Sequence, residues 1–159
     1  MQQINQAHIE AAIDIVDNFT DDQLEAHFEK FSEKYPVVLS YIHSAADEYD
    51  NDELHGLLAY YFCLISECFE QGKVVVTEIT EDDIEGFEEE FFAMLDEYFE
   101  SDNFDLVEEY TDQSELIQFM LMEISTPDED GSEMDDETAT QLFIVTTAMI
   151  TLIGKHIAE

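Results

Sequence analysis

The sequence predicts an all-α fold: a single compact, bundle-like domain of about eight helices that spans residues 1–159. Apolar residues recur at helical spacing through most of the chain, and the connections between these segments are short. The composition, 45% hydrophobic with 12 Phe and 7 Tyr, is sufficient for a sizeable core, which a disordered acidic chain would lack.

The first half of the chain contains four expected helices, at about 4–18, 21–35, 37–49 and 52–71. Thr20 is placed to cap the second helix. Pro36 ends that helix and opens the next, because proline fits only the first turn of a helix. Gly72 is expected to end the fourth helix. The only strand-like run, KVVVTEI at 73–79, follows. One strand cannot build a sheet, so we expect an extended connector there, with pairing to a second copy as the alternative.

Four further helices are expected in the second half, at about 81–100, 102–110, 114–125 and 135–157. Thr80 is placed to cap the first of them, with Asp83 at the position that completes a capping box. The stretch PDEDGSEMDDE, at 127–137, is the clearest polar segment. It predicts an acidic exposed loop over residues 126–134 within the domain.

The last helix is apolar on nearly all sides, since residues 138–154 carry no charge. A membrane span needs about 20 predominantly apolar residues. This run is shorter and contains several Thr and a Gln, so we expect a buried helix of a soluble protein rather than a span. A strip of small residues along it, Thr140, Thr147, Thr151 and Gly154, also allows the 135–157 helix to pack on a second copy as a homodimer.

The net charge of −37 is the strongest functional signal, because 41 acidic residues are opposed by four Lys and no Arg. Such a surface repels nucleic acid and anionic membranes, and it attracts basic proteins and cations. Residues 81–137 hold 24 of the acids and no Lys, Arg or His. We therefore expect the partner-binding surface to lie in that segment.

The stretch DDIEGFEEEFFAMLDEYFE, at 82–100, alternates acids with large apolar residues because a helix places the two kinds on opposite faces. Glu88 is the exception, since it projects into the apolar arc. It is expected to reach water near the bundle end, to be a buried acid that contacts a Tyr, His or Lys, or to bind a metal. The acids that we expect to form the partner-binding surface are Asp82, Asp83, Glu85, Glu89, Glu90, Asp96, Glu97, Glu100, Asp102, Asp105, Glu108 and Glu109.

No residue pattern predicts an enzyme, a cofactor or a specific metal site. The acidic loop lacks the spacing of an EF-hand, because Gly131 falls at position four instead of six. Loose binding of a divalent cation at 128–137 is the alternative. Asp52 and His55 have the spacing of a metal pair, but they lie at a helix start, where Asp is favoured as a cap. His8 projects onto the apolar face of the first helix and is expected to pack in the core.

The two cysteines, Cys63 and Cys68, project to different sides of one helix and cannot readily bond to each other there. Cys68 is expected on the apolar face, where a thiol is usually inert. Unpaired thiols and the absence of a signal-peptide pattern at the N-terminus predict a reducing compartment, the cytoplasm.

Two function hypotheses follow. In the first, the protein is a non-catalytic interaction protein that binds a basic protein surface. The more specific version is that it mimics nucleic acid and so inhibits or modulates a DNA- or RNA-binding protein. The nine acids of 82–100 occur about once per 3 Å along a helix, close to the charge spacing of one DNA strand. In the second, the acidity serves solubility or adaptation to high salt, and the role of the domain is unrelated to charge.

Overall fold

The computed structural model describes residues 4–111, 113–125 and 136–157. It confirms the all-α fold. The described residues form eight helices: α1 (Gln6–Asp17), α2 (Asp21–Lys34), α3 (Pro36–Tyr49), α4 (Asp52–Gln71), α5 (Glu81–Ser101), α6 (Asp105–Thr111), α7 (Ser114–Ser125) and α8 (Asp136–Lys155). In the described part of the chain no strand forms, and the only β-type pairing is one isolated bridge.

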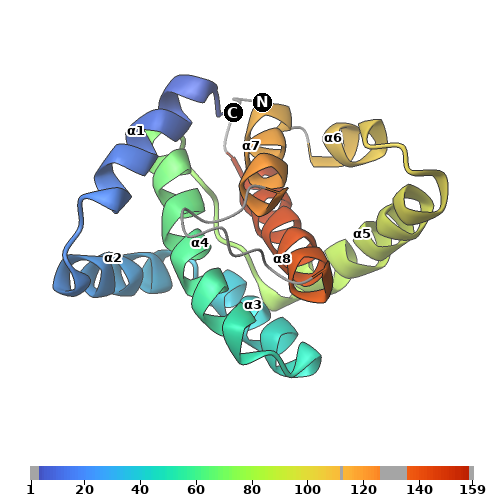
Figure 1. Cartoon of the computed structure of the whole chain (residues 1–159), viewed down its shortest axis with the longest axis horizontal. Helices are drawn as coiled ribbons and strands as arrows, with labels where there is room; N and C mark the ends of the chain where they lie inside the picture. The colour runs from blue at the N-terminus through green and yellow to red at the C-terminus, as the bar shows by residue number, and fades with distance from the viewer. Residues whose placement is uncertain (1–3, 112, 126–135, 158–159) are drawn as a thin grey trace.

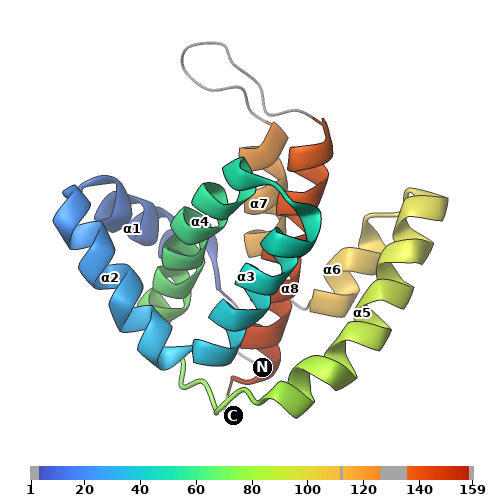
Figure 2. The same cartoon turned by 90° about the horizontal axis from the view of Figure 1, so that it is seen from below.

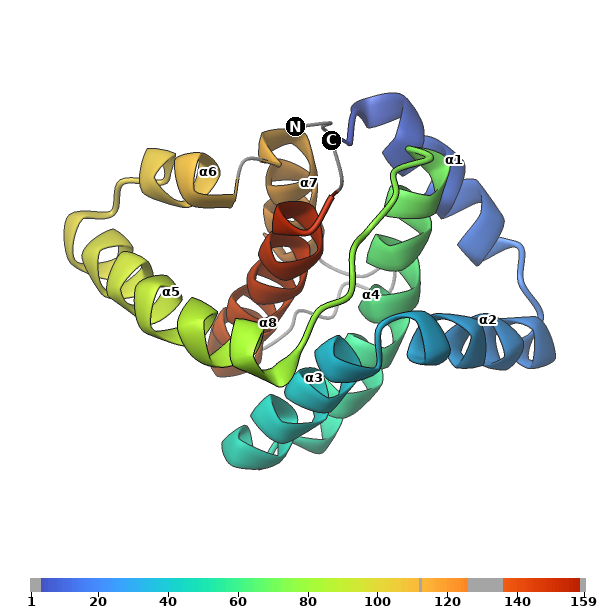
Figure 3. The same ribbon diagram turned by 180° about the vertical axis from the view of Figure 1, so that it is seen from behind.

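Helices α4 and α8 form the centre of the molecule (Figure 1). Helix α4 contacts α1, α2, α3 and α8, while α8 contacts α3, α4, α5, α6 and α7. Figures 1 and 3 show α1 and α2 at one end of the molecule and α5 and α6 at the other. The acidic helix α5 therefore packs on the core mainly along its side toward α6 and α8 (Figure 2).

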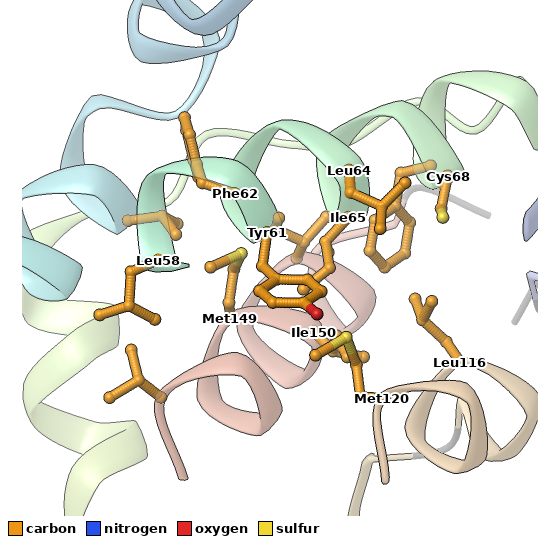
Figure 4. Packing of buried hydrophobic residues seen from close by; sticks show 14 of the residues in the cluster. Leu58, Tyr61, Phe62, Leu64, Ile65, Cys68, Leu116, Met120, Met149 and Ile150 are labelled. Carbon is orange, nitrogen blue, oxygen red and sulfur yellow. The ribbon is translucent and has the colours of Figure 1, made fainter. Parts of the chain in front are cut away.

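The main core lies where α4 and α8 meet α7 (Figure 4). Leu58 and Ile65 of α4, Met149 of α8 and Leu116 and Met120 of α7 are almost fully buried there. A smaller cluster joins α5 to α8 through the buried side chains Phe87, Phe91, Leu95, Ala148 and Leu152. Because Ala148 is small, the Phe rings of α5 can approach α8 closely.

Capping residues set the helix starts, as expected for Thr20 and Thr80. The hydroxyl of Thr80 accepts from the backbone N–H of Asp83 at 3.2 Å, and the Asp83 carboxylate accepts from the backbone N–H of Thr80 at 2.8 Å. Our prediction for His8 was wrong. Its Nδ1 accepts from the backbone N–H of Asn5 at 3.2 Å, so His8 completes a capping box at the start of α1 instead of packing in the core.

Helix α4 ends at Gly72 as predicted, but for a different reason. Gly72 has an ordinary helical φ of −71°, and the left-handed residue is Lys73, with φ 55°. A Cβ on Gly72 would lie 2.6 Å from Cδ1 of the buried Ile4. Glycine therefore permits the close approach of Ile4 here, and the backbone conformation does not require it.

The segment 73–79 is an extended connector between α4 and α5, as expected. It is held to the end of α8 by an antiparallel bridge between Val76 and Ile157. The N–H and the hydroxyl of Thr77 both donate to the carbonyl oxygen of His156, at 2.7 and 3.0 Å. The start of α5 and the end of α8 are thereby joined.

By its length and composition alone, helix α8 could cross a membrane. It is mostly buried inside the protein, however, as a core helix of a soluble protein would be. Thr147, Thr151 and Gly154 of its small-residue strip are buried by the same chain, with the side chain of Gln113 against Gly154. A second copy could therefore reach α8 only at other positions. Homodimerisation through this helix stays a prediction.

Candidate interaction surface and groove

The outer side of α5 and the adjoining α6 carry most of the acids that we expected to bind a partner. Ten of the twelve are exposed. We call this set the acidic surface: Asp82, Glu85, Glu89, Glu90, Asp96, Glu97, Glu100, Asp102, Asp105 and Glu109. Since residues 81–137 contain no Lys, Arg or His, no basic side chain within that segment offsets this charge.

The other two acids are half-buried and have local partners. Besides capping α5, the carboxylate of Asp83 lies 3.2 Å from Nε2 of His156. Hydrogen bonds from Thr80, and then the contact with His156, lower the pKa of Asp83. Glu108 accepts a hydrogen bond from the side-chain amide of Gln118 at 3.0 Å. Both residues are therefore engaged within the fold.

A groove runs between α3 and α5, and α8 contributes to its lining at one end. It consists of two adjoining hollows of about 450 and 330 Å³, which share Tyr41, Ser44 and Glu88. We call it the α3–α5 groove. Its further lining residues are Pro36, Val37, Ser40, Ala45, Glu48 and Tyr49 of α3, Glu81, Ile84, Glu85 and Phe92 of α5, and Ile144 and Val145 of α8.

The side of α5 that faces this groove mixes apolar and acidic residues. At ~100° per residue, Ile84, Glu88, Phe92 and Phe99 fall within an arc of about 80°. The core residues Phe87 and Phe91 lie on one side of this arc, and the row Glu85, Glu89 and Asp96 lies on the other. The buried Leu95 falls within the arc, next to Ile84. Phe92 and Phe99 are 44% and 53% exposed, which is unusual for Phe in a folded protein.

Glu88 lies in the groove, half-buried and beside Tyr41 and Ser44. This placement agrees with the expectation of a contact with a tyrosine. Burial, and next the negative charge of Glu88, raise the pKa of Tyr41. Tyr41 therefore stays a neutral phenol, able to donate a hydrogen bond into the groove.

The sequence predicted the acids of α5 but missed the groove. Tyr41, Ser44 and Tyr49 belong to α3, and no spacing in the sequence relates them to residues 84–92. Two signals were nevertheless present: Glu88 inside an apolar arc, and the pair Phe92 and Phe99, which extends that arc beyond what the core can cover.

Three histidines form close pairs with acids elsewhere in the molecule. His55 lies 3.1 Å from Asp47, His156 lies 3.2 Å from Asp83, and the half-buried His27 lies 2.9 Å from Glu67. Each pair links neighbouring elements of the fold. Burial raises the pKa of the Cys63 thiol to about 11, and burial with the neighbouring charge of Glu67 raises that of the Cys68 thiol to about 12, so neither thiol ionises readily.

Among the described residues, no group of three or more His, Cys, Asp or Glu side chains could hold a metal ion. Asp52 lies in the first turn of α4, which Asn51 caps. Most of the acidic segment 128–137, where we expected loose cation binding as an alternative, lies outside the described residues, as does the predicted loop 126–134.

Comparisons with known proteins give no family for the chain: no family model matches, and neither curated proteins nor solved structures give a significant match.

Proposed function

We propose that the protein is a non-catalytic interaction protein that binds a basic protein through the acidic surface. One observation carries the proposal: ten carboxylates are exposed along α5 and α6, in a segment without any basic residue. Charge gathered in this way attracts a basic partner, speeds its encounter and makes binding sensitive to salt.

A nucleic-acid-binding protein is the partner class that this surface suits best. Helix α5 carries ten acids over 21 residues, or about one per 3 Å, and each strand of DNA carries one charge per about 3.4 Å. The acids of α5 occur in two groups, 81–90 and 96–100, separated by a turn without charge. Mimicry would therefore involve two patches of phosphate-like charge.

The cytoplasm is the proposed location, supported by two cysteines that are buried and unpaired.

The test is affinity capture from the source organism's lysate with two matched variants. In the first, Glu89, Asp96, Glu97 and Glu100 of the acidic surface are changed to Lys. In the second, Glu10, Asp14, Glu29 and Glu33, exposed acids of α1 and α2, are changed to Lys. Each reversal adds two charges, so both variants move from −37 to −29.

We expect the wild type and the α1–α2 variant to retain one basic protein at low salt and the α5 variant to lose it, while circular dichroism shows all three folded. Equal capture by all three would contradict the proposal and favour acidity for solubility. Release of the captured protein by duplex DNA would support mimicry. Retention in the presence of DNA would overturn mimicry but leave the binding of a basic protein intact.

A further inference from the structure

The α3–α5 groove leaves apolar side chains only partly covered. Val37 and Tyr41 of α3, Ile84 of α5 and Ile144 of α8 are half-buried along it, and Phe92 is 44% exposed at its edge. These residues belong to three helices, and no described segment lies over them. An occupant that covered them would remove their apolar surface from water, which favours binding.

The groove has dimensions that suit a helix. Its lining on α3 runs from Pro36 to Tyr49, a distance of about 20 Å at 1.5 Å per residue. A helix of about four turns has that length, and a helix that lays an apolar stripe into a groove is a common mode of recognition. The stripe would pack against Tyr41, Phe92 and Ile144.

The acidic residues of the groove favour basic residues on both sides of the apolar stripe of that helix. Glu48 of α3 and Glu81, Glu85 and Glu88 of α5 line it, and none of its lining residues is Lys, Arg or His. Glu89 and Asp96 extend the acidic row along the solvent side of α5. An occupant with Lys or Arg on both sides of its apolar stripe would face Glu48 of α3 on one side and the acids of α5 on the other.

The same charge disfavours the other candidate occupants. A second copy of this chain has a net charge of −37 and only four Lys, so its approach would be repelled. Anionic lipids and nucleic acids are repelled for the same reason.

We infer that the α3–α5 groove binds a helical segment of a partner protein that carries an apolar stripe flanked by Lys or Arg. This inference rests on the proposed function and names the part of the basic partner that is recognised. The acidic surface draws the partner in, and the groove selects it by shape.

The test uses two fluorescent peptides of about 18 residues with the same content of Leu, Lys and Ala. In the first, the Leu residues form one helical stripe with Lys on both sides. In the second, the order is permuted so that no stripe forms. Binding to the full chain is measured by fluorescence anisotropy at physiological ionic strength, where long-range attraction is screened.

We expect the amphipathic peptide to bind at least about tenfold more tightly than the permuted one. Ser44→Trp should abolish that difference, because Ser44 is exposed and lines both hollows. Ala26→Trp, at an exposed position of α2, is the matched control and should preserve the difference. Phe92→Ser provides a second groove variant, which removes a surface side chain and should reduce binding of the amphipathic peptide alone.

Equal affinity for the two peptides, or unchanged selectivity in both groove variants, would overturn the inference. If light scattering shows that the wild type self-associates and Ser44→Trp abolishes this, the inference is overturned as well, because the occupant would then be a second copy.

Capture of the natural partner from the lysate distinguishes this inference from the proposed function. Capture lost in the α5 variant but unaffected by Ser44→Trp would leave the proposed function standing without the groove. Capture that survives both changes would refute both.

Discussion

His27 and Glu67 are the most buried pair of titratable side chains in contact among the described residues. Nε2 of His27 lies 2.9 Å from Oε2 of Glu67, and the side chains are 11% and 6% exposed. The His27 ring packs between Phe19 and Phe31, with ring centroids 4.9 and 4.5 Å away. Burial lowers the pKa of His27 more than the neighbouring Glu67 raises it. The folded protein therefore favours the neutral imidazole.

This pair predicts a loss of stability as the pH falls. Above about pH 6.5, His27 is neutral in both the folded and unfolded states. Below that value the unfolded chain takes up a proton more readily than the folded protein, so stability declines until the pH has passed the lowered pKa of folded His27. His27→Gln cannot titrate and should lose less stability over that window.

Urea unfolding at pH 7.5 and at successively lower values checks this expectation. The overall charge of the protein also changes with pH, but it affects the wild type and His27→Gln alike, so the difference between them isolates His27. Parallel stability curves for the two proteins would contradict the assignment.

Two glycines, one within α4 and one at its end, show how packing competes with helix propensity. Gly56 lies within α4 with no atom within 4 Å of its would-be Cβ, whereas the Cβ of Ala at position 72 would lie 2.6 Å from the buried Ile4. Gly56→Ala should raise the free energy of unfolding by about 0.5–1 kcal/mol, because glycine is costly inside a helix. Gly72→Ala should lower it by about 1–3 kcal/mol through overpacking.

Equilibrium unfolding in urea measures both changes, and an unchanged m-value would show that the unfolded state is unaffected. If Gly72→Ala were as stabilising as Gly56→Ala, the side chain of Ile4 would have to move without cost, and the tight contact between Ile4 and the end of α4 would not matter for stability.

The helices themselves were predictable because their signals are local. Apolar spacing placed α7 at 114–125, and Thr20, Pro36, Thr80 and Gly72 marked element boundaries that the structure confirms. The prediction for His8 failed for a local reason too. It lies three residues after Asn5, where a side-chain acceptor can complete a capping box, and this competed with its place on the apolar face.

The α3–α5 groove was not predictable in the same way, because it depends on how far apart two helices lie. Their separation follows from where α8 holds each of them: α5 packs on it through Phe87, Phe91 and Leu95, and α3 makes its own contacts with it. Glu88 was correctly singled out as unusual, but the sequence could not identify Tyr41 as its neighbour.

For the whole molecule, the net charge predicts that salt stabilises the fold. The exposed ion pairs of Lys30 and Lys34 with Glu70, at 3.5 and 3.3 Å, add little. Screening by salt should therefore reduce the repulsion among the carboxylates more than it weakens the few ion pairs. The melting temperature should rise with the concentration of sodium chloride.

Thermal unfolding of the wild type and of the two variants with net charge −29 checks this. Both variants should gain less from salt than the wild type, because less repulsion remains to be screened. A melting temperature that falls with salt, or an equal gain in all three proteins, would show that self-repulsion does not limit stability.

The central position of α8 has a consequence for synthesis. It follows α3, α4, α5, α6 and α7 in the chain and therefore leaves the ribosome after them, yet all five pack against it. Until it emerges, the apolar faces of those helices lack their main partner, and such faces promote aggregation in incomplete chains. By then most of the acids have already been made, so nascent chains repel one another during this interval. The charge that we assign to partner binding thus also protects the unfinished protein.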